Sequence, residues 1–356
     1  MQAQRDRARA ARQANQRVAV PDLRDLDIGA LRQDFAATKA RVVAIWKDGK
    51  LVEELNDGEE AGVILDVTPF YAEGGGQVGD TGLFISEMGR VRVTNAKKLP
   101  DGTIYHIAYV EEGLLRVGDA VKIEIDADKK LESARNHTAT HLLQAALKRV
   151  VGDQVNQAGS LVTPERLRFD FSNFEPVSPQ QLADVEKLVN KVILRGQDVD
   201  IRQMKQEEAR KLGAMALFGE KYGDIVRVVT VPGFSMEFCG GSHVANVAQI
   251  GMFKIVSETG VAAGVRRIEA ITGGAALAYA NKRFQTLDEA AALLKCQAED
   301  VPPHLTALLD EAKEMRRKLE TVRKMQEKAD AQKLLMAVQT YGDVQVLSLI
   351  HISEPT

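Results

Sequence analysis

The 356-residue sequence predicts an α+β fold in three parts, from its strand-like runs, a later alternation of helix and strand patterns, and a heptad pattern near its end. Residues 23–126 contain five short runs rich in valine and isoleucine, and Asp-Gly pairs typical of hairpin turns separate several of them. These runs predict a small β-barrel. Residues 127–275 predict an α/β subdomain with a mostly antiparallel sheet, and residues 276–340 predict a helical arm.

Helices of the middle part are predicted from their end signals. The first helix is predicted over residues 131–150. Ser178 is a predicted N-cap, and Pro179 suits the first position of a second helix that Gly196 ends. A third helix is predicted over residues 205–218, and strands are predicted over residues 166–171, 224–231, 251–258 and 265–272.

Apolar residues in the arm recur at alternating steps of three and four, which is typical of a coiled-coil seam. The seam consists of Leu305, Leu308, Ala312, Met315, Leu319 and Val322. An interruption is predicted at Val301, Pro302 and Pro303. The pattern fits a helical hairpin or a spacer arm, and it also fits a homodimer formed through the arm.

The two ends of the chain have different compositions. Residues 1–22 are rich in arginine and alanine and lack the apolar segment of a secretory signal, so we expect a linker helix, with an organelle transit peptide as the alternative. Residues 341–356 continue none of the patterns before them, and we expect a truncated or non-native tail. No apolar run reaches the roughly 20 residues that span a bilayer, so no membrane association is expected.

Charge and cysteine content exclude some classes of protein. A net charge of −3 excludes a uniformly basic surface, so any nucleic acid must bind to a local patch. Only two cysteines are present, Cys239 and Cys296, and their neighbouring sequences differ. Such sparse cysteine suits a reducing compartment, and we expect a cytoplasmic protein.

Two distant segments each offer a pair of metal ligands. His137 and His141 lie four residues apart on the first predicted helix, so both imidazoles can face one ion. Cys239 and His243 are also four apart, and the glycines between them allow a tight backbone. One thiolate and three imidazoles match the four nitrogen and sulfur ligands of tetrahedral zinc.

The residue after the first histidine limits the chemistry. Zinc proteases with this histidine spacing carry a catalytic glutamate there, but this chain has Thr138, which disfavours peptide hydrolysis. Four protein ligands also suit a structural zinc site. Thr140 lies beside His141, and its hydroxyl either faces the same pocket or bonds its own helix backbone.

Several ordered motifs resemble the editing domain of alanyl-tRNA synthetases. They are TPFYAEGGGQVGDTG, RNHTATHLL, QVNQAGSLV, FSMEFCGGSHV and AGVRRIEAITG. The resemblance runs from about residue 25 to residue 273 and continues into the arm. It implies zinc-dependent hydrolysis of misacylated tRNA(Ala), chiefly the seryl and glycyl esters. It also implies that the class II aminoacylation domain lies outside this chain, that residues 1–22 connect to that domain, and that the arm leads to a C-terminal domain through which the protein could also dimerise.

Roles implied by the resemblance fall on particular residues. His137, His141, Cys239 and His243 match the family's zinc ligands, and Thr140, Gln157 and Cys239 are the candidate catalytic residues. Thr140 and Gln157 are expected to hydrogen-bond the serine hydroxyl, which alanine lacks. Candidate RNA contacts are Arg266, Arg267, Lys211 and Lys221. The competing hypothesis is a tRNA-binding module with a structural zinc ion and no catalytic activity.

Overall fold

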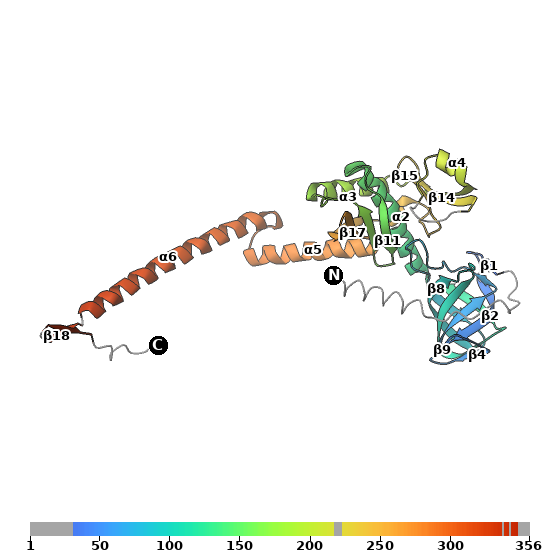
Figure 1. The fold of residues 1–356 in the computed structure, drawn as a ribbon, viewed down its shortest axis with the longest axis horizontal. Helices are drawn as coiled ribbons and strands as arrows, with labels where there is room; N and C mark the ends of the chain where they lie inside the picture. The colour runs from blue at the N-terminus through green and yellow to red at the C-terminus, as the bar shows by residue number, and fades with distance from the viewer. Residues whose placement is uncertain (1–30, 217–222, 337, 342, 348–356) are drawn as a thin grey trace. The chain divides into compact units, whose positions relative to one another are not determined.

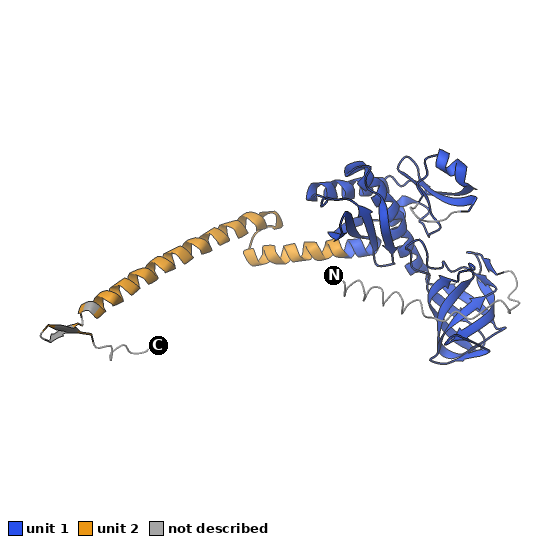
Figure 2. Ribbon diagram, viewed as in Figure 1, with its two compact units in different colours: residues 1–278 blue, residues 279–356 orange. Residues whose placement is uncertain are grey.

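The computed structural model describes residues 31–216, 223–336, 338–341 and 343–347 (Figure 1). The chain divides into two units, residues 1–278 and residues 279–356 (Figure 2). The linker helix predicted over residues 1–22 lies outside the described residues, as does most of the tail predicted over residues 341–356. The finer domain boundaries predicted above stay predictions.

A closed antiparallel ring of strands forms the barrel (Figure 1). In ring order its members are β2 (Lys39–Lys47), β5 (Glu60–Leu65), β9 (Ile104–Arg116), β8 (Gly89–Lys98), β7 (Gly82–Ile85) and β10 (Ala120–Ile125), and β10 pairs back with β2. Short strands flank the ring: β1 (Arg32–Gln33), β3 (Lys50–Val52), β4 (Glu54–Asn56) and β6 (Val67–Thr68). Side chains that alternate inward fill the barrel, including Val42, Val63 and Phe84. The predicted barrel is confirmed.

One of the predicted Asp-Gly turns adopts the backbone of a type I′ hairpin. Asp48 and Gly49 connect β2 to β3 and have φ angles of 52° and 79°. Positive φ at both central positions is typical of a type I′ turn, whose twist matches that of the strands. The strand β7 was not predicted, because its four residues follow directly after a glycine-rich loop.

The α+β part consists of two helices on a four-stranded sheet, with a second sheet beside them. The larger antiparallel sheet has the order β11 (Gln157–Val162), β12 (Leu167–Ser172), β17 (Val265–Thr272) and β16 (Phe253–Ala262). The smaller sheet contains β13 (Asp200–Lys205), β14 (Ile225–Val231) and β15 (Ser235–Phe238), and a short 3-10 helix, η1 (Val247–Ile250), follows it. Helices α2 (Ala127–Val150) and α3 (Pro179–Ile193) pack on the larger sheet and share one hydrophobic core with it. The predicted fold class is confirmed.

Helix ends follow the predicted signals in one case and differ in another. Ser178 forms a capping box with Gln181 at the start of α3, as its sequence predicts. Helix α4 (Gln206–Lys211) is much shorter than the predicted helix over residues 205–218. Gly213, with φ of 87°, turns the chain away from the helix, and Met215 then forms a β-bridge with Glu237.

The arm contains α5 (Gly273–Leu294), the 3-10 turn η2 (Ala298–Asp300) and α6 (Val301–Met336). The predicted interruption lies between the end of α5 at Leu294 and the start of α6 at Val301. Pro302 and Pro303 lie in the first turn of α6, where backbone N–H groups have no partner within the helix, so proline is tolerated there. The predicted seam residues are all exposed, and dimerisation through them stays a prediction. A short hairpin, β18 (Gln339–Tyr341) and β19 (Val344–Val346), overlaps the predicted tail. Among the described helices, none has the length and apolar character needed to cross a membrane.

The barrel core contains a histidine that predicts how stability depends on pH. His106 is fully buried, and its ring nitrogens contact Thr68 Oγ1 at 2.8 Å and the Val63 carbonyl at 3.0 Å. Burial lowers its pKa to about 4. The unfolded chain, with a histidine pKa of about 6.5, binds more protons below that pH, so the free energy of unfolding should fall by up to about 3 kcal/mol between pH 6.5 and pH 4.

Urea unfolding at several pH values, compared with His106→Gln, measures this contribution. Glutamine retains a donor and an acceptor but does not titrate. The variant should lose less stability over that pH range than the wild type, because it lacks the titration of His106. The loss that remains comes from other buried histidines, which titrate in both proteins. Equal losses in the two proteins would show that His106 is not the group responsible.

Candidate metal centre

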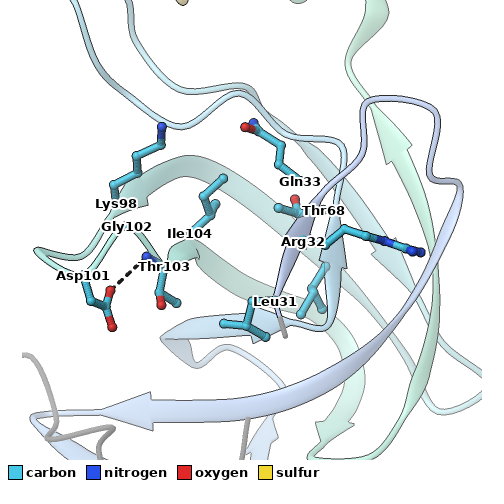
Figure 3. A pocket seen from close by; sticks show the side chains of 10 residues that line it. Leu31, Arg32, Gln33, Thr68, Lys98, Asp101, Gly102, Thr103 and Ile104 are labelled. Atoms are coloured by element: carbon cyan, nitrogen blue, oxygen red, sulfur yellow. Dashed lines mark hydrogen bonds between the residues drawn. The ribbon is translucent and has the colours of Figure 1, made fainter. Parts of the chain in front are cut away.

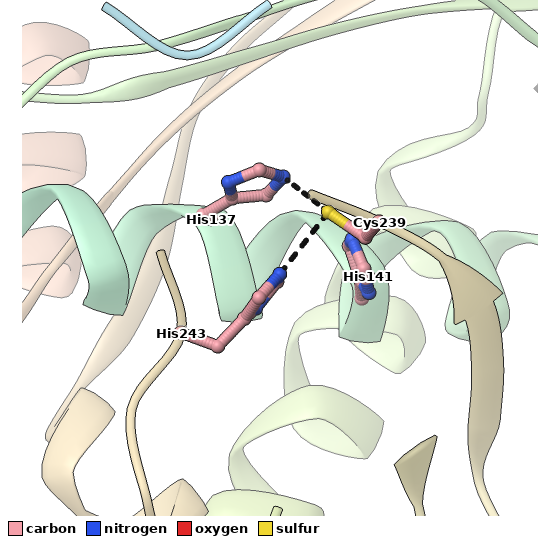
Figure 4. Close-up of side chains that lie close together, drawn as sticks. All are labelled: His137, His141, Cys239 and His243. Atoms are coloured by element: carbon pink, nitrogen blue, oxygen red, sulfur yellow. Dashed lines mark hydrogen bonds between the residues drawn. The ribbon is translucent and has the colours of Figure 1, made fainter. Parts of the chain in front are cut away.

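The structure brings His137, His141, Cys239 and His243 together between α2 and the segment after β15 (Figure 4). One ligand atom from each residue lies within 4.8 Å of all the others. Helix α2 supplies both predicted imidazoles from one face, as their spacing requires. Cys239 follows directly after β15, so the edge of the smaller sheet positions its sulfur against the helix.

Hydrogen bonds orient two of the imidazoles toward the thiol. His137 Nδ1 donates to Gln77 Oε1 at 2.6 Å, and His243 Nδ1 contacts Thr138 Oγ1 at 3.1 Å. The Nε2 atoms of both rings therefore face inward. His137 Nε2 lies 3.3 Å from Cys239 Sγ, and His243 Nε2 lies 3.2 Å from it. Tetrahedral zinc with ordinary bond lengths places sulfur and nitrogen ligands about 3.5 Å apart, so the spacing fits this metal.

Burial keeps the histidines neutral, which is the form that binds metals. Desolvation, followed by the charge of Arg227, lowers the pKa of His137 to about 4. Desolvation and the neighbouring positive groups place the pKa values of His141 and His243 well below the usual range. Within the described residues, the buried Nδ1 of His141 has no hydrogen-bond partner. A buried polar nitrogen without a hydrogen-bond partner costs free energy unless a bound molecule or ion interacts with it.

The loop from Cys239 to His243 is held by Arg227 and closely packed at Gly241. Arg227 donates to the carbonyls of Cys239 and Gly241, both at 2.8 Å. A Cβ at Gly241 would overlap the His137 ring, whereas a Cβ at Gly240 would meet no atom within 4 Å. Neither glycine has a φ in the left-handed region. Of the two glycines, only Gly241 is required sterically, because of close approach rather than backbone conformation.

A cavity of about 220 Å³ opens beside the four ligands. Thr140 and Gln157 both line it, together with the glycine-rich loop at Gly74 and Gly75. Thr140 Oγ1 donates to the Asn136 carbonyl at 2.8 Å, so its hydroxyl can still accept a hydrogen bond from a bound molecule. Gln157 Nε2 donates to Ser160 Oγ at 3.1 Å. The two uses of Thr140 that the sequence left open are therefore compatible.

Glu237 is a buried acid in the same cavity, and sequence analysis did not identify it. Its Oε2 lies 3.9 Å from His141 Nε2, and burial raises its pKa to about 8. The only sequence signal was its position two residues before Cys239. In an extended chain, residues two apart point to the same side, so Glu237 faces the same way as Cys239.

A second hollow, of about 380 Å³, lies on the barrel (Figure 3). Its lining includes Arg32, Gln33, Thr68 and Asp101, and Asp101 accepts a hydrogen bond from the Thr103 amide at 2.9 Å. The residues that line it include no histidine or cysteine. Lys98 lines both this hollow and the cavity beside the metal ligands.

The predicted RNA contacts that the structure describes lie on two different elements. Arg266 and Arg267 are adjacent in β17, so their side chains leave opposite faces of the sheet. Arg266 forms a two-point pair with Glu258, and Arg267 forms one with Asp170. Lys211 ends α4, and Lys221 lies outside the described residues.

Comparison with known proteins decides the family. A model of class II (A) tRNA synthetases matches residues 1–129, and a model of the threonyl and alanyl tRNA synthetase second additional domain matches residues 226–269. An alanine–tRNA ligase of Geobacillus kaustophilus is 46% identical over 98% of this chain, and one of Acetivibrio thermocellus is 51% identical over 80% of it. The chain belongs to the alanyl-tRNA synthetase family.

The chain spans 40% of the length of the Geobacillus relative and 32% of the length of the Acetivibrio relative. The matched second additional domain contains Cys239 and His243, while His137 and His141 lie between the two matched regions. The resemblance stated from the sequence motifs is confirmed.

Gly241 supplies a matched test of the centre. Gly241→Ala should weaken zinc binding about 10-fold to 100-fold, because the new methyl group overlaps His137 and displaces a ligand. Gly240→Ala, one residue away and open to space, should bind zinc as the wild type does. Competition with a chromophoric chelator measures both affinities. If both variants bind zinc equally well, the close approach of Gly241 to His137 does not matter for the site.

Proposed function

We propose that this chain hydrolyses the ester of misacylated tRNA(Ala), in particular the seryl ester, in a reaction that requires zinc. The main support is one cavity lined by three of the four possible metal ligands, His137, His141 and Cys239, together with Thr140 and Gln157. The names of the relatives, alanine–tRNA ligases, support alanine and tRNA as the chemical context. The proposal concerns proofreading rather than ligation.

Zinc is proposed as the metal because three imidazoles and one thiolate suit its ligand preference. His137, His141, Cys239 and His243 would hold it. A bound zinc ion would supply Lewis acidity near the ester carbonyl or an attacking water. The chain itself supplies a cavity that orients the ester, and orientation matters because an ester carbonyl is already a good electrophile.

Selection of serine over alanine is proposed to involve Thr140 and Gln157. A serine hydroxyl in the cavity can donate to Thr140 Oγ1, whose own proton is used by the Asn136 carbonyl. Alanine cannot form this bond, so its ester is held less well. Lys98 on the rim is proposed to contact a phosphate of the tRNA end. Arg266, Arg267, Lys211 and Lys221 stay proposals as further RNA contacts.

Deacylation by the 356-residue chain tests the function directly. We expect rapid release of serine from seryl-tRNA(Ala), slow release of alanine from alanyl-tRNA(Ala), and loss of the seryl activity in Cys239→Ala, because the metal centre loses its thiolate. Release of radiolabelled amino acid measures all three rates.

Thr140→Val keeps the side-chain shape and should lower the seryl-to-alanyl rate ratio about tenfold.

Folding and zinc content must be verified for each variant, by circular dichroism and metal analysis. If the folded, zinc-loaded wild type cleaves neither ester faster than buffer does, the catalytic proposal fails. In that case, retained tRNA binding would favour the alternative of a structural-zinc binding module.

Lys98 gives a separate prediction about tRNA binding. A phosphate contact releases about one counterion, so Lys98→Ala should reduce the slope of log affinity against log salt by about 1. Filter binding at several salt concentrations measures this slope. The control is Lys50→Ala, an exposed lysine of β3 that lines none of the hollows described above. Equal slopes for Lys98→Ala and the wild type would remove Lys98 from the interface.

A further inference from the structure

Gln77 is a fully buried polar residue at the end of the glycine-rich barrel loop. Its backbone forms a tight turn with Gly74, with hydrogen bonds of 3.0 Å and 3.1 Å in the two directions. The neighbouring Gly76 and Val78 pair with Val162 of β11. This pairing fixes where the Gln77 side chain begins, and it joins the loop to the larger sheet.

The Gln77 amide reaches the metal centre from the barrel side. Its Oε1 accepts from His137 Nδ1 at 2.6 Å and from the Ser242 amide at 2.9 Å. Its Nε2 donates to Ser242 Oγ at 3.2 Å. The Ser242 amide can only donate, so the oxygen of the Gln77 amide must face it. The same oxygen can bind His137 only if that ring carries its proton on Nδ1.

The nitrogen of His137 that carries the proton determines whether the other nitrogen can bind a metal ion. With Nδ1 protonated, His137 Nε2 carries the lone pair, and this atom faces Cys239 Sγ at 3.3 Å. Gln77 therefore contacts both halves of the centre: the ligand His137 on the helix, and Ser242 in the loop between the ligands Cys239 and His243.

We propose that Gln77 is a positioning residue that holds His137 in its metal-binding tautomer and couples metal binding to the seating of the glycine-rich loop. This inference rests on the zinc centre of the proposed function. Because Gln77 binds both halves of the centre, a metal ion that draws the halves together also strengthens the contacts of the loop. The loop forms one wall of the cavity, at Gly74 and Gly75. Metal binding and the shape of the substrate cavity are thus linked through one side chain.

The glycine content of the loop supports this coupling. Gly76 has φ of 82°, and a Cβ there would overlap Ser160 of β11. The loop therefore lies directly on the strand that carries Gln157, the other wall residue of the cavity. A side chain at this point would lift Gln77 away from His137.

Zinc affinity and cobalt spectra of the 356-residue chain test the proposal without any tRNA. Gln77→Leu removes the acceptor and should weaken zinc binding about 10-fold to 100-fold and change the visible spectrum of the cobalt-substituted protein. Gln77→Glu retains the acceptor for His137 and the Ser242 amide, so it should restore tight binding. Ser242→Ala removes only the partner of Gln77 Nε2 and should leave the affinity within about twofold of the wild type.

Hydrogen exchange tests the coupling. Zinc should increase the protection of backbone amides at residues 74–79 in the wild type and much less in Gln77→Leu. Wild-type affinity and cobalt spectrum in Gln77→Leu would overturn the positioning role, and equal protection in both proteins would overturn the coupling. Because no ester is used, these results are independent of whether the chain deacylates tRNA. A wild type that binds neither zinc nor cobalt would overturn the zinc centre itself.

Discussion

Burying three imidazoles and a thiol at one point is the constraint on which the α+β part depends. Neutral imidazoles lose hydrogen bonds to water when they are buried, and the structure replaces only some of them, through Gln77 and Thr138. A metal ion would satisfy the inward atoms. The two ligand pairs come from α2 and from the segment after β15, about a hundred residues apart. Bringing them together costs the conformational entropy of closing the chain between them, which the rest of the fold must offset. Binding of a metal ion would then stabilise the closed arrangement.

The barrel is part of this arrangement because two connections join it to the centre. Strand β10 ends at Ile125, and Asp126 directly caps the helix that carries the ligands. The glycine-rich loop returns to the same helix through Gln77. One connection is covalent and the other consists of hydrogen bonds, and together they place a barrel loop in the cavity wall. Substitutions in this loop can therefore affect a site to which the barrel contributes no metal ligand.

Local patterns predicted much of this structure, and the two ligand pairs together predicted one metal site, whereas most other contacts between distant residues were not predictable. Spacing alone placed His137 and His141 on one helix face, and Ser178 with Pro179 predicted the start of α3. The Gln77 contact joins residues 60 positions apart, and no periodicity encodes it. Arg266 and Arg267 were both predicted as RNA contacts, but their side chains leave opposite faces of the sheet because they are adjacent on a strand. The helix predicted over residues 205–218 ended early because a β-bridge at Met215 competed with it.

The hydrogen bonding of Thr140 limits how much selectivity one hydroxyl can provide. Its proton is already donated to the Asn136 carbonyl, so an alanyl ester would leave only an acceptor unpaired. An under-used acceptor costs less than a buried donor without a partner, and such acceptors are less rare in proteins. Thr140 alone would therefore favour serine only modestly, and Gln157 or the cavity wall must contribute the rest. A glycyl ester has no hydroxyl to bind, so its hydrolysis would depend on orientation and on the tolerance of the cavity for small groups. Under the proposed function, the site would therefore exclude alanine by several weak differences rather than by one strong one.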